Sequence, residues 1–400
     1  MNPVDNGFVL ICAALVMFMT PGLALFYGGM TRSKNVLGTV MQSFIMLGLV
    51  SVLWALIGYT LAFGSDLGGI IGGLDFLALN GVGMDNTNSP ADNLSHQTFM
   101  IFQCMFAVIT PALITGAFAE RIKFSAFLLF SALWLILVYS PMAHWVWGGG
   151  WMGEMGALDF AGGAVVHMSS AAAALAACFA LGKRKGYGER AFIPHNLPMT
   201  ILGAGILWFG WFGFNAGSAL AADGVAANAF VTTQFAAGIA ALTWIIMEWL
   251  HRGKPTTLGA ASGAIAGLVA ITPGAGFVGP MSALVIGGLA GIFCYGGVLL
   301  KSKLGYDDAL DVVAIHGIGG TWGALATGLF ASVGAQGLFF GNPGQLWIQF
   351  VSVVATWAFC FILSYVLFKI VDAVVGLRVS EENEIKGLDI SEHSEAGYQF

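Results

Sequence analysis

Eleven long apolar segments, separated by polar breaks, dominate this sequence and decide what it can fold into. They lie at about residues 7–29, 36–62, 97–118, 124–143, 161–181, 196–216, 227–250, 257–271, 278–300, 312–331 and 346–371. A helix needs about 20 apolar residues to cross a bilayer. Only 9% of the residues are charged, against roughly 25% in a soluble domain. The sequence therefore predicts an all-α polytopic membrane protein with eleven transmembrane helices.

The positions of the fifteen Lys and Arg residues test this count. All of them lie at or after the end of an odd-numbered segment: Arg32, Lys34, Arg121, Lys123, Lys183, Arg184, Lys185, Arg190, Arg252, Lys254, Lys301, Lys303, Lys369, Arg378 and Lys386. The alternate loops, including the long loop 63–96, contain none. Basic residues collect on the cytoplasmic side of a membrane. We therefore expect a multi-pass protein of the inner (plasma) membrane, with the N-terminus outside and the C-terminus in the cytoplasm.

The remaining composition excludes several classes of protein. The start, MNPVDNGF, lacks the basic region of a cleavable signal peptide, so we expect it to begin the first membrane helix. The net charge of −6 gives no reason to expect a nucleic-acid partner. The five cysteines lie in apolar segments without metal-ligand spacing, which favours buried, reduced thiols over disulfides.

One motif occurs twice. DFAGGAVVH runs from Asp159 to His167 and DALDVVAIH from Asp308 to His316, in the fifth and tenth segments. Five crossings separate the two copies, so they enter the membrane from opposite sides. This pattern predicts an inverted repeat, with the functional site where the halves meet. Eight residues of helix rise about 12 Å, which would carry both histidines to a similar depth.

The repeat also sets the expected domain organisation. A transmembrane domain would occupy residues 1–376, with repeat halves at about 7–181 and 196–331 and an eleventh helix at about 346–371. Residues 377–400 would form a polar, acidic cytoplasmic tail.

The paired histidines are the first candidates for function. Ionisable residues inside a membrane are costly and usually functional, and a matched pair in an inverted repeat strengthens that interpretation. The alternatives are two packing histidines or a metal pair. Zinc sites usually need three or four ligands, and no further ligand lies at helical spacing from either histidine.

Several longer motifs resemble those of the ammonium transporter family (Amt/Mep, related to Rh proteins), in its bacterial form. The resemblance extends from the first helix to the tail. It rests on PGLALFYGGM at 21–30, FQCMFAVITPALITGAFAER at 102–121, AHWVWGGGWM at 143–152, GALDFAGGAVVHMSSAAAAL at 156–175, WFGWFGFNAGS at 208–218 and DDALDVVAIHGIGGTWGAL at 307–325.

The resemblance implies a role for each matching residue. His167, His316 and Trp211 would line a hydrophobic pore, and Phe106 and Phe214 would close its outer mouth. Asp159 would organise the outer vestibule. An external recruitment site would use these side chains: Trp147, Ser218, Phe102 and Phe106. From the residues alone, Trp147 also fits an interface anchor, and phenylalanines four residues apart fit ordinary helix packing.

The implied function is ammonium transport for nitrogen uptake. Aromatic faces attract a small cation by about 0.5–2 kcal/mol, and a serine oxygen can accept one of its protons. An ammonium ion would lose its hydration shell in the pore at a cost of roughly several kcal/mol. We therefore expect deprotonation and conduction of ammonia, with the proton co-translocated.

The resemblance also implies partners and leaves two rivals. It implies a homotrimer in a lipid bilayer, methylammonium as an analogue of the substrate, and a PII-type regulatory protein at the cytoplasmic face. Neither a cofactor nor a metal is expected. One rival is an ammonium sensor with little transport. The other is a membrane enzyme, but the sequence contains no nucleophile or cofactor motif to support it.

Overall fold

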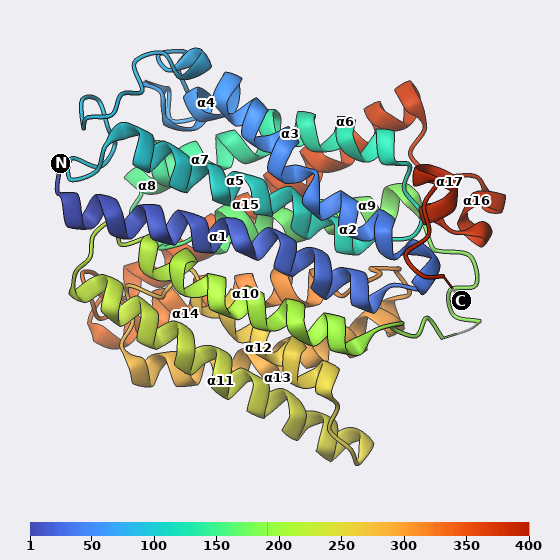
Figure 1. Ribbon diagram of the computed structural model, residues 1–400. Helices are drawn as coiled ribbons and strands as arrows, with labels where there is room; N and C mark the ends of the chain where they lie inside the picture. Colours follow the sequence, from blue (N-terminus) through green and yellow to red (C-terminus); the bar gives the residue numbers. More distant parts are fainter. Residues whose placement is uncertain (190, 400) are drawn as a thin grey trace.

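Long helices run side by side between two ends of the molecule (Figure 1). The computed structural model describes residues 1–189 and 191–399. We call the end that holds Met1 the N-terminal face, and the end that holds the tail helices the C-terminal face. Within these residues, nine helices are long and apolar enough to cross a membrane. The chain is therefore an all-α polytopic membrane protein, as the sequence predicts.

The first half of the chain ends with the helix that carries His167. Its elements are α1 (Pro3–Met30), η1 (Ser33–Asn35), α2 (Val36–Phe44), α3 (Met46–Leu53), η2 (Trp54–Gly58), α4 (Tyr59–Phe63), the antiparallel pair β1 (Asp66–Leu67) and β2 (Ile71–Gly72), η3 (Leu77–Leu79), α5 (His96–Phe118), α6 (Phe124–Trp134), η4 (Leu135–Tyr139), α7 (Ser140–Trp147), α8 (Trp151–Glu154), η5 (Gly163–Met168) and α9 (Ser169–Leu181). Several spans are compound: α2 to α4, for example, form one continuous rod.

The second half ends with the helix that carries His316, and it is followed by one long helix and the tail. Its elements are α10 (Leu197–Gly217), α11 (Gly224–Arg252), α12 (Thr257–Ile271), α13 (Pro280–Leu304), η6 (Val313–Ile318) and α14 (Gly319–Phe330). After them come η7 (Leu338–Phe340), α15 (Pro343–Val375), α16 (Glu381–Lys386) and α17 (Leu388–His393).

Each apolar segment of the sequence overlaps a helical segment of the structure. The eighth, α12, spans the predicted 257–271, but it is shorter than the nine long helices. The tenth, η6 with α14, is not among those nine either. α12 packs against α10, α11, α13 and α14, whereas η6 and α14 pack against α12 and α13 and also against η5, α9 and α15. All five cysteines are buried free thiols, as predicted.

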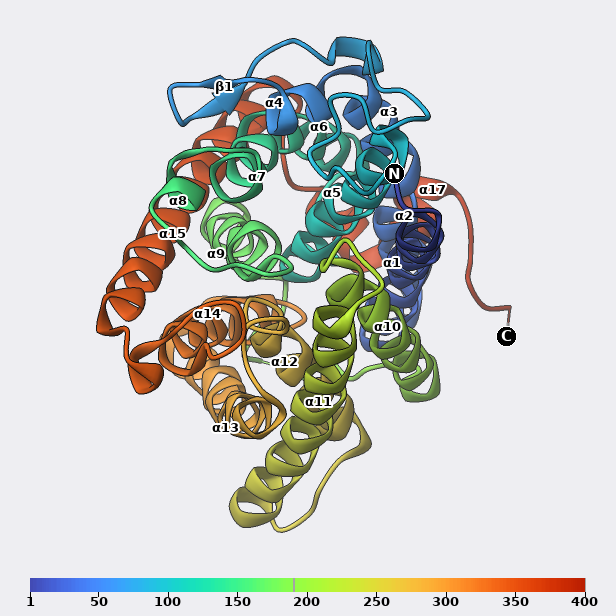
Figure 2. The same cartoon turned by 90° about the vertical axis from the view of Figure 1, so that its left-hand side faces the viewer.

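The two halves lie against each other and run in opposite directions. Viewed along the helices, α10 to α14 form one group beside α1 to α9, and α15 lies at the side of both (Figure 2). Arg184, just after α9, bonds to Asp307, just before η6, with Nη2 to Oδ1 at 2.8 Å. The C-terminal end of one histidine helix therefore adjoins the N-terminal end of the other.

A buried ion cluster joins the halves at the C-terminal face. The Glu120 carboxylate accepts hydrogen bonds from the backbone N–H of Arg32 at 2.8 Å and from Arg184 Nη1 at 3.1 Å. Arg184 also donates to both carboxylate oxygens of Asp307, at 2.8 and 2.9 Å. Burial alone would raise the pKa of Glu120, but Arg184 and Arg32 bring it below its ordinary value. Arg184, with Arg121, does the same for the pKa of Asp307.

A second link, made of hydrogen bonds without a basic side chain, joins the halves at the N-terminal face. Asn93 donates from Nδ2 to Asp5 Oδ2 at 2.9 Å and to the carbonyl of Leu220 at 2.7 Å. The other oxygen of Asp5 accepts from the backbone N–H of Ala222 at 2.9 Å. Loop 64–95 of the first half is thereby held against the turn between α10 and α11.

The helices approach closely where small residues face a neighbouring backbone. A side chain at Gly203 in α10 would overlap the backbone of Phe26 in α1, and one at Gly267 in α12 would overlap Ala236 in α11. Small residues permit such contacts between membrane helices.

The structure corrects one expectation about the histidine helices. Asp159 and Asp308 do not lie in helices. η5 begins at Gly163, after a left-handed Gly162 with φ of +111°. η6 begins at Val313, after a left-handed Asp311 with φ of +62°. Only the second part of each eight-residue interval is helical, so the expected 12 Å rise is wrong.

The tail is ordered from residue 377 to 399 rather than a free end. Asp389 accepts hydrogen bonds from the backbone N–H groups of Leu37 and Gly38, at 3.1 and 2.8 Å. Leu388 donates from its backbone N–H to Asn35 Oδ1 at 2.8 Å. The tail helices therefore cap α2 on the C-terminal face.

Candidate functional site

The two histidines of the repeated motif meet at the centre of the molecule. Their Nδ1 atoms are 3.2 Å apart, and their ring planes are inclined by 25° with centroids 5.2 Å apart. Each ring lies on a π-helical turn, η5 or η6. Such turns place an extra residue in a helix and occur often at functional sites. The structure thus brings together the pair that the sequence predicts.

Thr272 fixes the arrangement of hydrogen bonds around the pair. Its hydroxyl donates to the carbonyl of Leu268 at 2.7 Å and accepts from Trp211 Nε1 at 2.9 Å. His167 Nε2 lies 3.3 Å from the same oxygen. When the hydroxyl proton is assigned to the short contact with Leu268, His167 Nε2 is the donor in its contact with Thr272.

This assignment determines the tautomers of an uncharged pair. With its proton on Nε2, His167 offers a bare Nδ1 as an acceptor. His316 must then carry its proton on Nδ1 and donate to His167. Its Nε2 remains a bare acceptor. The chain of donors therefore runs from His316 through His167 to Thr272.

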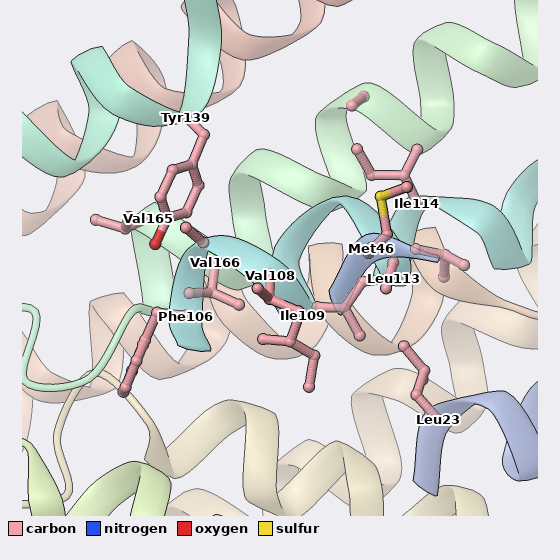
Figure 3. Close-up of a cluster of buried hydrophobic side chains, with 14 of the residues drawn as sticks. Leu23, Met46, Phe106, Val108, Ile109, Leu113, Ile114, Tyr139, Val165 and Val166 are labelled. Atoms are coloured by element: carbon pink, nitrogen blue, oxygen red, sulfur yellow. The ribbon is translucent and has the colours of Figure 1, made fainter. Parts of the chain in front are cut away.

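A narrow cavity passes the histidine pair. Its volume is about 10 Å³, close to the least space that holds one water molecule. Apart from the two histidines and Trp211, its walls are apolar: Met19, Leu23, Phe26, Ile109, Leu113, Val166, Leu207, Phe214 and Ile265. Figure 3 shows part of this wall, with Ile109 and Leu113 projecting from α5 and Leu23 approaching from α1. A solute there must shed almost all of its water.

Two phenylalanines close the cavity toward the N-terminal face. The rings of Phe106 and Phe214 stack with centroids 4.2 Å apart and an interplanar angle of 25°. Each is only 1% exposed. His167 lies next in the row, with its ring centroid 6.1 Å from that of Phe214.

Beyond the phenylalanines, a wider cavity of about 180 Å³ lies at the N-terminal face. Its walls include Phe99, Gln103, Phe106, Trp147, Phe160 and Ser218. The Ser218 hydroxyl donates to the carbonyl of Phe214 at 2.8 Å, which leaves its oxygen as an acceptor. Phe102 is fully buried and lies behind this cavity, where it packs edge-on against Phe106.

Asp159 connects this cavity to the histidine helix. Its carboxylate accepts from four successive backbone N–H groups, those of Gly162 to Val165, at 2.5 to 3.3 Å. Its carbonyl accepts from Trp147 Nε1 at 2.9 Å. Asp159 thus satisfies the unpaired N–H groups that begin any helix and fixes the indole at the same time.

Asp308 repeats this role in a weaker form. It accepts from the backbone N–H of Val313 at 2.7 Å. Its other carboxylate oxygen has no partner among residues 1–189 and 191–399. Each half therefore has an aspartate that accepts backbone N–H groups at the start of the histidine helix, but Asp308 accepts fewer of these hydrogen bonds than Asp159 does.

Sequence reasoning missed two polar residues of the site, Thr272 and Gln103. Thr272 ends the short α12 directly before Pro273, and a hydroxyl at that position is the signal that could have pointed to it. Among the residues that the structure describes, no three His, Cys, Asp or Glu side chains converge as a metal site requires. The histidine pair therefore lacks the further ligands that zinc would need.

A narrow apolar cavity inside a bundle of membrane helices, closed by stacked aromatic rings and lined by two adjacent imidazoles, is typical of a membrane transport protein. The chain belongs to the Ammonium Transporter Family, whose model matches residues 7–398. It is a transporter rather than an enzyme.

Individual relatives agree over the whole length. The chain is 56% identical over 401 residues to an ammonium transporter of Bacillus subtilis strain 168, covering 99% of this chain and 98% of the relative. It is 50% identical over 401 residues to Amt1 of Archaeoglobus fulgidus, covering 100% of both. Among solved structures, Mep2 of Saccharomyces cerevisiae superposes with a TM-score of 0.90 at 35% identity, covering 96% of this chain and 88% of Mep2. A sensor Amt protein gives 0.91 at 30% identity, covering 98% of both.

Proposed function

We propose that this protein recruits ammonium at the cavity of the N-terminal face, removes a proton and conducts ammonia past the histidine pair. The observation that carries the proposal is the size and polarity of the pore. A passage of about 10 Å³ with apolar walls cannot hold a hydrated cation. A neutral molecule of the size of water fits it.

Recruitment uses groups that suit a small cation. Trp147 and Phe106 lie edge to face, with ring centroids 6.1 Å apart, and their faces attract a cation. The oxygen of Ser218 can accept one N–H of ammonium. The proposed role of Phe102 is indirect, because it supports Phe106 from behind.

Deprotonation follows from the cost of desolvation. An ion that enters a dry pore loses hydration at a cost of about several kcal/mol, and ammonia avoids this cost. Potassium cannot lose a proton, so the same barrier excludes it. We place this step at the stacked rings of Phe106 and Phe214, where the wide cavity ends.

The histidine pair gives ammonia its polar contacts inside the pore. The bare Nε2 of His316 can accept an N–H of ammonia while both rings remain uncharged. In the row formed by His316, His167 and Thr272, the bare nitrogen is Nε2 of His316, and His167 is the ring next to Phe214. Co-translocation of the proton through this row therefore requires both imidazoles to exchange tautomers, so that His167 accepts the proton and His316 releases it. Trp211 holds Thr272 in that row, which is its proposed role in the pore.

The proposal places the N-terminal face outside the cell and the C-terminal face in the cytoplasm, across eleven membrane spans in the inner (plasma) membrane. The one-sided distribution of Lys and Arg supports this orientation. Family resemblance supports a homotrimer and a PII-type regulator at the cytoplasmic face, where the tail lies.

The second candidate function is an ammonium sensor. The similarity to a sensor Amt protein over 98% of both chains supports considering this second function. A sensor would bind ammonium in the same cavity but conduct little, so measured current separates the two functions.

The test is current recorded from purified protein in liposomes under gradients of ammonium, methylammonium and potassium. We expect current with the first two cations and none with potassium. The double variant His167→Ala, His316→Ala should lose at least about nine-tenths of the ammonium current, since it removes the polar atoms of the pore. The double variant removes both rings of the pair, so neither imidazole is left unpaired, and folding is checked by gel filtration. Wild-type current from the folded double variant would contradict the mechanism, and binding without current in the wild type would favour the sensor.

A further inference from the structure

Gln103 is a buried polar side chain that the mechanism above does not use. It lies on α5 in line with Phe99 and Phe106, four residues after the first and three before the second, so all three share one helix face. That face forms a wall of the wide cavity. The side chain is only 8% exposed.

The amide of Gln103 is incompletely bonded. Its Oε1 atom is buried and has no hydrogen-bond partner in the part of the chain that the structure describes. A buried polar atom without a partner is unfavourable, and native proteins retain few of them. The terminal torsion of a glutamine is broad, so the amide can turn its oxygen toward the cavity.

The cavity beside Gln103 needs acceptors for a cation. Its described wall residues carry no formal charge, and its only hydroxyl is that of Ser218. Ammonium has four N–H groups. Aromatic faces can attract the ion, but they satisfy an N–H less well than an oxygen does. A second oxygen would complete the site.

We propose that Gln103 is a recruitment ligand whose amide oxygen accepts one N–H of the ammonium ion while Ser218 accepts another. This rests on the proposed function. Two acceptors and a set of aromatic faces sort alkylated ammonium ions by their remaining N–H groups. Dimethylammonium keeps two N–H groups and satisfies both oxygens. Trimethylammonium keeps one and leaves an oxygen unpaired.

The experiment measures binding of methylammonium, dimethylammonium and trimethylammonium to the detergent-purified protein, by titration calorimetry or tryptophan fluorescence. In the wild type we expect affinity to fall about tenfold between the dimethyl and trimethyl ions, which corresponds to about 1.4 kcal/mol. Gln103→Leu should weaken methylammonium binding about tenfold and abolish the fall between the two larger ions.

Gln42→Leu is the matched control. Gln42 is also buried, at 3% exposure, and its Oε1 also lacks a described partner, but it lies in α2 away from the cavity. This variant should bind all three ions as the wild type does. If Gln103→Leu does not fold, Gln103→Met keeps the side-chain length and answers the same question.

The outcomes are distinguishable. Wild-type binding by folded Gln103→Leu, with the fall between the two larger ions retained, would make Gln103 a packing residue while leaving the conduction mechanism intact. Binding by the wild type without ammonium current would contradict the conduction mechanism while leaving the role of Gln103 intact.

Discussion

Asp159 is the residue that connects the wide cavity to the histidine helix. It accepts four backbone N–H groups at the start of η5 and one indole N–H from Trp147. The helix so fixed carries His167, and the indole so fixed faces the recruitment cavity. Asp159 therefore links the two parts of the site through different atoms: its carboxylate caps the histidine helix, and its backbone carbonyl holds the indole.

Replacing Asp159 with asparagine should disturb the cap of the histidine helix, while the backbone carbonyl that holds Trp147 remains. Asparagine has one acceptor oxygen, and its NH₂ group would face the N–H groups that the second carboxylate oxygen now accepts. Hydrogen bonds to a charged group contribute about 1.5–3 kcal/mol. We expect a lower melting temperature and at least about a tenfold loss of ammonium current.

Asp223 provides the matched control for that variant. It is an exposed carboxylate that caps α11 by accepting from Val225 and Ala226. Asp223→Asn should cost no more than an ordinary cap, about 0.5–2 kcal/mol, and leave the current unchanged. Equal effects of the two substitutions would reduce Asp159 to an ordinary helix cap.

The residues of the site were predictable only where a motif names them. The histidines, the stacked phenylalanines and Asp159 lie where the motifs predict them. Thr272 and Gln103 were not predictable, because their importance depends on partners distant in the sequence. The hydroxyl of a threonine in an apolar helix usually donates to a carbonyl of the preceding turn. Nothing in the sequence indicates that Trp211 and His167 also contact the hydroxyl oxygen of Thr272.

At the scale of elements, the apolar segments predicted the helices well, but not how the histidine helices begin. Hydropathy does not distinguish an α-helix from a π-helical turn. The left-handed residues Gly162 and Asp311 precede η5 and η6 and follow Asp159 and Asp308. The start of each helix depends on packing between the halves, which hydropathy does not report. The docking of the tail on α2 also depends on contacts between distant segments, so the sequence did not predict it.

The cluster of Glu120, Arg184 and Asp307 gives these elements a dependence on pH. Both carboxylates have a folded-state pKa below their ordinary values of 4.5 and 3.8. Their contribution to stability is therefore fully present above those values and is lost as the pH falls through the lowered folded-state pKa. We expect the melting temperature in detergent to drop steeply below about pH 4.

Glu120→Gln tests this origin. It leaves Arg184 with one buried partner fewer, and breaking a buried pair costs about 3–5 kcal/mol. The variant should be less stable at neutral pH and lose less stability on acidification. Asp75→Asn, at an exposed loop carboxylate whose pKa is also lowered, should leave the profile nearly unchanged. A Glu120→Gln profile parallel to that of the wild type would show that other groups govern acid stability.

At the scale of the whole molecule, the one-sided charge predicts its orientation. Because Lys and Arg follow only odd-numbered segments, a reporter fused after residue 400 should lie in the cytoplasm, and one inserted near Asn86 should lie outside. The measurement is the activity of a reporter enzyme that folds on one side of the membrane only. Reversed signals would overturn the orientation and with it the direction of uptake.

The links at both faces have a consequence for how solute crosses. The halves are tied at one end by the buried cluster around Glu120 and at the other by part-buried hydrogen bonds from Asn93 to Leu220 and from Ala222 to Asp5, so one half cannot swing against the other without breaking bonds at both ends. Rocking of this kind is how many inverted-repeat carriers expose their site to each side in turn. Because the halves are held together at both ends, we expect no such rocking cycle. Solute preloaded on the far side of the membrane should therefore not accelerate the initial rate of entry, as it would in a carrier that must return to its starting conformation.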